Sequence, residues 1–284
     1  ASQSPSVSSD LSIVNKPSPV DNLPLETTVF ASLSPTRHVF SPSLSSTQSE
    51  ALSSMPQTQS SEVIRVPETL YTYQGHSNRV INVIWSPDSK NVASSGHDGL
   101  IQLWNMADGN LEVIYRGHAG FLVNAMMWSH DGFRIASGGR DSTVQIWNKN
   151  TLSRDVTYRG HTNNVNALIW LPDGQRIVSA SDDMTIQIWD ATTSSHKFIY
   201  RGHASAVKAM ASSPDGSRIA SAENSNEIHI WDTTSIHRIF TYRGHPNQIS
   251  ALGWSYDGKY IASGDSNGLV QVLSLIHISE PTRQ

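Results

Sequence analysis

A Gly-His dipeptide returns at an almost constant interval through most of this 284-residue chain. Successive histidines of the dipeptide lie 42 or 43 residues apart. The five copies are Gly75-His76, Gly117-His118, Gly160-His161, Gly202-His203 and Gly244-His245. A fixed period of this length indicates an array of similar units that pack against their neighbours. A polar side chain that occurs once could serve catalysis, but the same side chain in consecutive repeats is typical of a scaffold.

Each repeat has the composition of four short β-strands. In the first repeat the apolar segment 80–85 (VINVIW) precedes a polar turn at 86–90 (SPDSK), and later repeats add strand-like segments such as 134–138 (RIASG) and 143–147 (TVQIW). Val, Ile, Tyr and Trp are common in strands, whereas Pro, Asp and Gly form the turns between them. The alternation in 143–147 gives that strand one inward face. Four strands in each unit of this length, with no amphipathic helix pattern, predict the blades of an all-β propeller.

Tryptophan-containing dipeptides 28 or 29 residues after the Gly-His histidines support this reading. Two repeats have Trp-Asp, at Trp189-Asp190 and Trp231-Asp232. Two others have Trp-Asn, at Trp104-Asn105 and Trp147-Asn148. With these motifs in register, residues 69–273 resemble the WD-repeat β-propeller family. The regularity of neighbouring repeats is similar to that of bacterial members. The resemblance implies five visible four-stranded blades, at about 69–110, 111–153, 154–195, 196–237 and 238–272.

The resemblance also implies how the ring would be completed. Because propellers of this family most often have seven blades, we expect an incomplete seven-bladed propeller. A strand near Leu70–Tyr73 is expected to close the ring by pairing with the last natural blade.

The two ends of the chain differ from the repeats. Residues 1–66 are rich in Ser and Pro and contain no Gly, Trp or Tyr. Such a segment buries too little apolar surface to offset its chain entropy, so we expect a disordered linker. Residues 273–284 (LSLIHISEPTRQ) break the repeat pattern and resemble the translation of a sequencing-library adapter, so we expect an artefactual tail. The propeller itself is therefore assigned to residues 67–272.

The resemblance further implies a buried hydrogen-bonded tetrad of His, Ser, Asp and Trp in each blade. Imidazole, hydroxyl, carboxylate and indole groups can satisfy one another in this way. The fourth blade has Ser225 at the Asp position, and the fifth has Asn267 there and Leu273 at the Trp position, so we expect these two blades to be looser. The complete sets are His76, Ser94, Asp98 and Trp104; His118, Ser137, Asp141 and Trp147; and His161, Ser179, Asp183 and Trp189.

Several kinds of chemistry are disfavoured by these patterns. A Ser-His-Asp hydrolase needs one triad with an exposed nucleophile, not three copies at equal offsets, so no enzyme activity and no catalytic residue are expected. The histidines show no paired metal-ligand spacing, cysteine is absent, and no Gly-rich phosphate loop occurs, so we expect no metal site and no cofactor. The net charge of −4, without a basic cluster, disfavours the binding of nucleic acid. No apolar run is long enough for membrane insertion.

Protein or peptide binding on the top face of the propeller is the leading hypothesis, because loops on a rigid scaffold commonly carry recognition. The alternative is a C-terminal regulatory or sensor module of a larger protein, such as a bacterial Ser/Thr kinase. We expect a monomer when the ring is complete. The favoured compartment is the cytoplasm, or an extracytoplasmic one if the chain is tethered to a membrane kinase. The candidate partner-binding residues are Arg79, Phe121, Asn124, Arg140, Asn164, Asn166, Lys208 and Gln248.

Overall fold

The computed structural model describes residues 69–118 and 120–276. The expected linker at 1–66, and residues 277–284 of the expected tail, lie outside these ranges. Every regular element in the described ranges is a β-strand, and no helix occurs there.

The strands form five antiparallel sheets in which chain order is also spatial order. The first sheet contains β1 (Val80–Trp85), β2 (Asn91–Gly96), β3 (Ile101–Asn105) and β4 (Leu111–Tyr115). The second contains β5 (Val123–Trp128), β6 (Arg134–Gly139), β7 (Val144–Asn148) and β8 (Ser153–Tyr158). The third contains β9 (Val165–Trp170), β10 (Arg176–Ser181), β11 (Ile186–Asp190) and β12 (His196–Tyr200). The fourth contains β13 (Val207–Ser212), β14 (Arg218–Glu223), β15 (Ile228–Asp232) and β16 (Arg238–Tyr242), and the fifth contains β17 (Ile249–Trp254), β18 (Tyr260–Asp265) and β19 (Val270–Ser274).

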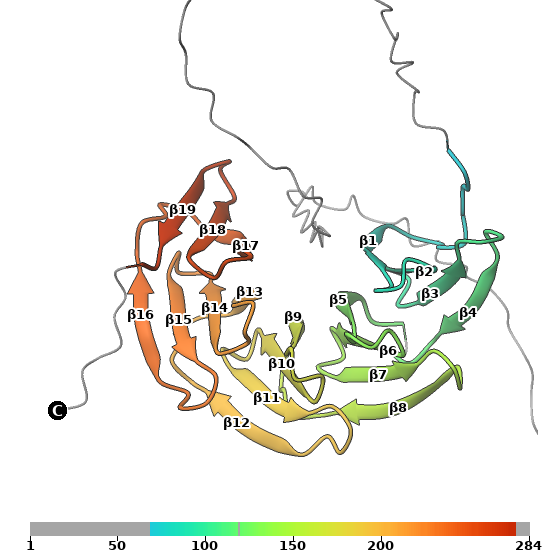
Figure 1. Ribbon diagram of the computed structural model, residues 1–284, viewed down its shortest axis with the longest axis horizontal. Coiled ribbons are helices and arrows are strands. Elements are labelled where there is room, and N and C mark those ends of the chain that lie inside the picture. The colour runs from blue at the N-terminus through green and yellow to red at the C-terminus, as the bar shows by residue number, and fades with distance from the viewer. Residues whose placement is uncertain (1–68, 119, 277–284) are drawn as a thin grey trace, which may run out of the picture.

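The sheets stand side by side in an open arc, with β1, β5, β9, β13 and β17 toward its centre and β4, β8, β12 and β16 on its outside (Figure 1). The main contacts between sheets in the described part join neighbours in chain order, chiefly through these inner strands. This arrangement confirms the all-β, bladed fold expected from the repeats.

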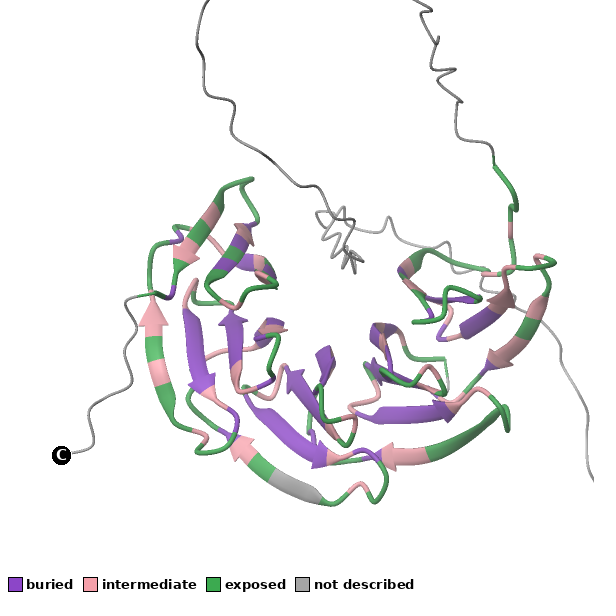
Figure 2. Cartoon of the chain, in the orientation of Figure 1, coloured by how far each residue is buried: buried purple, intermediate pink, exposed green. Residues whose placement is uncertain are grey.

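The hydrophobic core lies between adjacent sheets and is deepest in the middle of the arc (Figure 2). Trp189 and Trp231 are completely buried, and each indole is stacked on a tyrosine ring from the preceding sheet, Tyr158 and Tyr200 respectively. Stacked aromatic pairs of this kind bury large apolar areas with a defined geometry. The first four sheets are therefore joined by a repeated tyrosine–tryptophan contact, which Tyr115 and Trp147 make between the first and second.

The turns between first and second strands show why Asp and Gly recur there. In the second sheet, Ser129 Oγ donates a hydrogen bond to Asp131, whose carboxylate also accepts the Phe133 amide. Gly174 in the corresponding turn of the third sheet has a φ of +68°, a conformation in which glycine carries no steric penalty. These local bonds set the hairpin geometry of each sheet.

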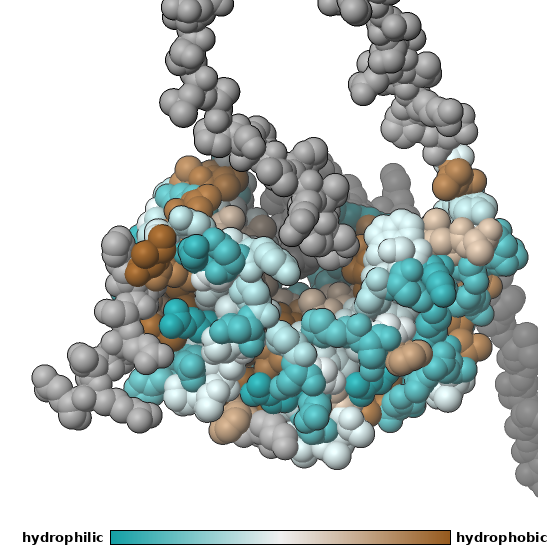
Figure 3. Space-filling view, in the orientation of Figure 1, coloured by the Kyte–Doolittle hydropathy of each residue, from teal (hydrophilic) through white to brown (hydrophobic). Residues whose placement is uncertain are grey.

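The two ends of the arc differ from the expectation of uniform four-stranded blades. The fifth sheet has three strands among the described residues, and the strand expected near Leu70–Tyr73 is not formed. Tyr73 instead packs against Trp104, with ring centroids 5.3 Å apart. No described strand pairs with this segment, so its backbone has no ladder to join. Hydrophobic residues lie exposed over β18 and β19 at the other end of the arc (Figure 3), among them Val270 and Val272.

Candidate functional site

The polar tetrads of the second and third sheets are brought together as continuous hydrogen-bonded sets. In the third sheet, His161 Nδ1 lies 2.8 Å from Asp183, and its Nε2 lies 2.8 Å from Ser179 Oγ. Trp189 Nε1 donates to the same hydroxyl at 3.2 Å. The second sheet repeats the arrangement, with His118 between Asp141 and Ser137 and with Trp147 donating to Ser137. That these bonds stabilise the blades stays a prediction.

The first sheet assembles only three members of its set. His76 lies 3.0 Å from Asp98 through Nδ1 and 2.9 Å from Ser94 through Nε2. Trp104 Nε1 is buried and has no hydrogen-bond partner among the described residues. The structure therefore does not bring Trp104 into the set.

The fourth and fifth sheets obtain their carboxylates from a different position. Glu223, at the end of β14, places Oε2 3.3 Å from His203 Nδ1, while Ser225 in the turn donates to Glu223 instead of meeting the histidine. In the fifth sheet, Asp265 lies 3.5 Å from His245 Nδ1. Both carboxylates come two residues earlier than the aspartates of the other sheets. Ser225 and Asn267 therefore do not leave these two sheets without a carboxylate beside the histidine. That the two blades are looser stays a prediction.

The hydrogen bonds fix the charge state of these groups. Burial alone would raise the pKa of Asp183, but hydrogen bonds from His161 and Thr185 hold that pKa well below its ordinary value. The pKa of Asp141 is lowered by the same kinds of bond, from His118 and Thr143, against the opposing effect of burial. Burial, with a smaller contribution from neighbouring His229, lowers the pKa of His203 to about 4. The carboxylates are thus ionised at neutral pH.

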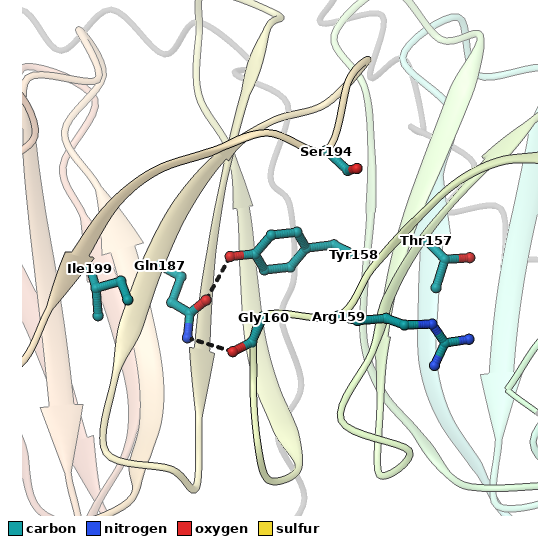
Figure 4. Close-up of a pocket in the computed structure, with 7 residues that line it drawn as sticks. All are labelled: Thr157, Tyr158, Arg159, Gly160, Gln187, Ser194 and Ile199. Carbon is teal, nitrogen blue, oxygen red and sulfur yellow. Dashed lines mark hydrogen bonds between the residues drawn. The ribbon is translucent and has the colours of Figure 1, made fainter.

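A tyrosine–glutamine hydrogen bond joins the outer strand of one sheet to the third strand of the next. Tyr158 Oη at the end of β8 donates to Gln187 Oε1 on β11 at 2.6 Å, and Gln187 Nε2 donates to the Gly160 carbonyl (Figure 4). A shallow pocket of about 490 Å³ lies over this contact. Tyr242 and Gln271 repeat the bond between the fourth and fifth sheets. Between the third and fourth sheets a histidine, His229, takes the glutamine's place opposite Tyr200.

Two sets of loops meet at one edge of every sheet, and we call this edge the loop edge. It consists of the segments after each Gly-His dipeptide and of the turns between second and third strands. A backbone hydrogen bond ties the two sets together in each sheet. The donor and acceptor pairs are His97 and Arg79, Arg140 and Leu122, Asp182 and Asn164, Asn224 and Ala206, and Ser266 and Gln248.

Arg79, His97, Phe121 and Arg140 form what we call the basic-aromatic patch, on the loop edge of the first and second sheets. Phe121 is 51% exposed, and its carbonyl oxygen lies close against Gly99 in the turn of the first sheet. Burial first, and then the charges of Arg79 and Arg140, lower the pKa of His97. The patch offers an exposed aromatic ring and two exposed arginines on neighbouring loops.

The candidate residues of the third and fourth sheets form a separate network around Asp182. Its carboxylate accepts hydrogen bonds from Asn164, Asn166 and Lys208, at 3.0, 2.6 and 2.8 Å. These bonds, opposed by partial burial, lower the pKa of Asp182. Many of the hydrogen-bonding atoms of these side chains are therefore already bonded within the chain.

Two of the candidate asparagines reach from one inner strand to the next, as Asn82 does between the first and second sheets. Asn124 donates to the Val165 carbonyl at 3.0 Å, and Asn166 donates to the Val207 carbonyl at 2.9 Å. Gln248, the remaining candidate, is half-buried on the loop edge of the fifth sheet. Asn124 and Asn166 thus link adjacent sheets, whereas Arg79, Phe121 and Arg140 stand exposed.

The opposite edge carries a larger and more apolar groove. Its volume is about 800 Å³, and its walls include Trp85, Met127, Trp170 and Leu252 from four inner strands. Ser137 and Ser179, the hydroxyls of the tetrads, are completely buried and do not line it. A nucleophilic serine must be reachable by substrate, so this geometry does not match a hydrolase site.

The comparisons with known proteins agree with the architecture. The family model described as WD domain, G-beta repeat, matches residues 67–105, 109–148, 153–190, 194–232 and 236–273. The chain is 41% identical over 46 residues to a Notchless protein homolog of Arabidopsis thaliana, covering 16% of this chain and 10% of that protein. It is 36% identical over 47 residues to a Periodic tryptophan protein 2 homolog of Dictyostelium discoideum, covering 16% and 5%.

An uncharacterized WD repeat-containing protein, L84, of Acanthamoeba polyphaga mimivirus is 36% identical over 44 residues, covering 16% of this chain and 33% of that protein. The matched segments thus span at most a third of these relatives' own lengths. No helix in the described ranges has the length and apolar character needed to cross a bilayer. The five family matches take up more than half of the chain, and each ends at the third strand of one of the five sheets, so this chain belongs to the WD-repeat family.

Proposed function

We propose that the chain is a non-enzymatic scaffold that binds a protein or peptide through its loop edge. WD repeats generally mediate protein–protein interaction, and the family typically lacks catalytic activity. The burial of the tetrad serines supports the absence of hydrolytic chemistry. Rigid sheets that present variable loops at one edge are suited to recognition.

The observation that carries this proposal is the exposed ring of Phe121 on the same loop edge as the exposed Arg79 and Arg140. Aromatic and arginine side chains dominate the binding energy of many interfaces, the ring by filling a pocket and the guanidinium by paired hydrogen bonds. The chain as a whole is acidic, so this concentration of positive charge is local. The patch therefore favours a peptide that offers an apolar side chain flanked by carboxylates.

Selection from a displayed peptide library against the purified chain tests the proposal. Selected peptides should be enriched in Asp and Glu around one apolar residue, and Phe121→Ala or Arg140→Ala should weaken their binding by at least tenfold, about 1.4 kcal/mol.

Phe133→Ala and Lys90→Ala are the matched controls. Phe133 is 53% exposed, close to the value for Phe121, and both control residues lie in turns at the opposite edge. If the controls weaken binding as much as the patch variants do, or if no peptide binds, the loop edge is not the recognition surface.

The alternative, a regulatory module of a larger kinase-like protein, is compatible with the same surface and stays a prediction from the sequence. In that case the selected peptide sequence should match a segment of the larger protein itself.

A further inference from the structure

The fourth sheet differs from the other four by a group of metal-ligand residues at its buried loop edge. His229 on β15 stands where the other sheets have glutamine, namely Gln102, Gln145, Gln187 and Gln271. Glu223 stands where the first three sheets have Gly96, Gly139 and Ser181, and Glu227 stands where they have Leu100, Thr143 and Thr185. Three substitutions in one blade thus add an imidazole and two carboxylates next to the repeat histidine His203.

Three of these side chains converge in the folded chain, and Glu227 lies beside the third, His229. Donor atoms of His203, Glu223 and His229 all lie within 4.8 Å of one another, and these three side chains are at most 2% exposed. His203 Nδ1 lies 3.3 Å from Glu223 Oε2, and His229 Nε2 lies 3.3 Å from Glu227 Oε2. Zinc bonds of ~2.0–2.1 Å in a tetrahedron place neighbouring ligand atoms about 3.4 Å apart. Both measured pairs already have that separation.

The hydrogen bonds around the two imidazoles leave one nitrogen of each directed to the group. His203 Nε2 is bonded to Ser221 Oγ at 2.7 Å, and His229 Nδ1 is bonded to Tyr200 Oη at 3.0 Å. Histidines that ligate metals almost always have their second nitrogen held in this way, which fixes the tautomer and the ring orientation. His203 Nδ1 is buried and has no hydrogen-bond partner among the described residues, an arrangement that is costly unless something else satisfies it.

The fifth sheet provides an internal contrast. His245 Nδ1 also lacks a partner in the described ranges, and Asp265 lies beside it. Gln271, however, occupies the position of His229, so that sheet offers one imidazole instead of two. The unpartnered nitrogen alone is a feature of both sheets, whereas the second imidazole and second carboxylate belong to the fourth.

We propose that the fourth sheet binds one divalent transition-metal ion, of the zinc type, through His203 Nδ1, His229 Nε2 and the carboxylates of Glu223 and Glu227. Two neutral imidazoles and two carboxylates would balance the charge of a divalent ion in a buried setting. Mixed imidazole and carboxylate donors suit zinc and its neighbours better than calcium or magnesium.

Binding requires a local rearrangement that can be observed. The rings of His203 and His229 are stacked, with centroids 4.2 Å apart and planes 8° apart. Both rings must turn so that their lone pairs point to one position. Glu227 is 24% exposed and pairs with Arg243 at 2.7 Å, so it provides the side of the group closest to solvent.

Calorimetric titration of the untagged, EDTA-treated chain with zinc chloride tests the proposal. One equivalent of zinc should bind and should raise the melting temperature. His229→Gln, which restores the residue found in the other four sheets, should fold normally in EDTA but lose zinc affinity by roughly 100-fold or more. The melting temperature of this variant should no longer respond to zinc.

Two further measurements separate this site from adventitious binding. His237→Gln, at an exposed histidine of the same sheet, should bind zinc as the wild type does. Cobalt in place of zinc should give the strong visible absorption of a tetrahedral site in the wild type and in His237→Gln, but not in His229→Gln. The proposal is overturned if the wild type binds no zinc, or if His229→Gln binds it equally well.

Discussion

The third and fourth sheets share one backbone arrangement but take their polar groups from different places in the chain. In the third sheet, His161 meets Asp183, which lies in the turn after β10. In the fourth, His203 meets Glu223, which is the last residue of β14. Trp189 and Trp231 are equally buried in the two sheets. The comparison teaches that a carboxylate can reach the repeat histidine from more than one position in the sequence.

Removing the repeat histidine should give the largest effect. His161→Ala removes bonds to Asp183 and Ser179 and leaves a buried space, so it should lower the free energy of unfolding by about 2–4 kcal/mol. His203→Ala should cost about 1 kcal/mol less, because His203 Nδ1 makes no hydrogen bond in the described part. Urea denaturation in EDTA measures both, with the exposed Thr162→Ala as control. Equal losses would show that the two sheets are held in the same way despite their different carboxylates.

Replacing the buried serines should give the next largest loss of stability. The loss should be the same in the third and fourth sheets, because both serines make the same contacts. Ser179 and Ser221 each accept an indole N–H and contact a histidine. Ser179→Ala and Ser221→Ala should each cost about 1–2 kcal/mol, because each leaves a buried donor without a partner. Thermal unfolding followed by tryptophan fluorescence measures both. A loss of stability in only one of the two variants would mean that the serine–histidine–tryptophan contacts do not contribute equally in the two sheets.

Acid should weaken the third sheet through Asp183. The pKa of this carboxyl is lower in the folded chain than its ordinary value of 3.8, so the unfolded chain binds more protons as the pH falls. The stabilisation is complete above the ordinary pKa and is lost as the pH drops through the folded-state value. Asp183→Asn should flatten the loss of stability below about pH 5. Asp155→Asn, on the exposed outer strand β8, is the control substitution.

The ion pair between the two sheets should give the smallest effect. Lys208 lies 2.8 Å from Asp182, and both side chains are partly exposed. Lys208→Ala should therefore lower stability by only about 0.5 kcal/mol, and the loss should shrink further in high salt. A loss above about 2 kcal/mol would show that this contact, and not the buried network, joins the third and fourth sheets.

The repeat made most of the fold predictable. Gly-His spacing and the Trp dipeptides placed the sheets, since every period carries the same alternating strands and the same Asp- and Gly-containing turns. The predicted segment 80–85 is β1, and 143–147 overlaps β7. Whether residues 70–73 form a strand could not be predicted from their own sequence, because a strand forms only where a second strand is available to pair with it.

The polar sites were predicted less well, for a geometric reason. Glu223 and Asp265 are the last residues of their strands, whereas the aspartate was expected two residues later, in the turn that follows. Both places lie beside the repeat histidine, so either can supply its carboxylate. Scanning both positions for a carboxylate would have found them. The His203, Glu223 and His229 group escaped the search for paired ligand spacing because its members come from a loop and from two adjacent strands. What could have shown it is a departure from the repeat, a histidine at a position where every other sheet has glutamine.

The way the sheets are joined has a mechanical consequence. Each sheet is held mainly by the one before it and the one after it, so tension applied between the ends of the arc has a single route through the molecule. In an optical trap the chain should extend in discrete steps, one for each repeat, on the order of 140 Å per step for a fully stretched unit of this period. A partner that bridged two sheets would merge two of those steps into one, and the length of the merged step would report which sheets it spans.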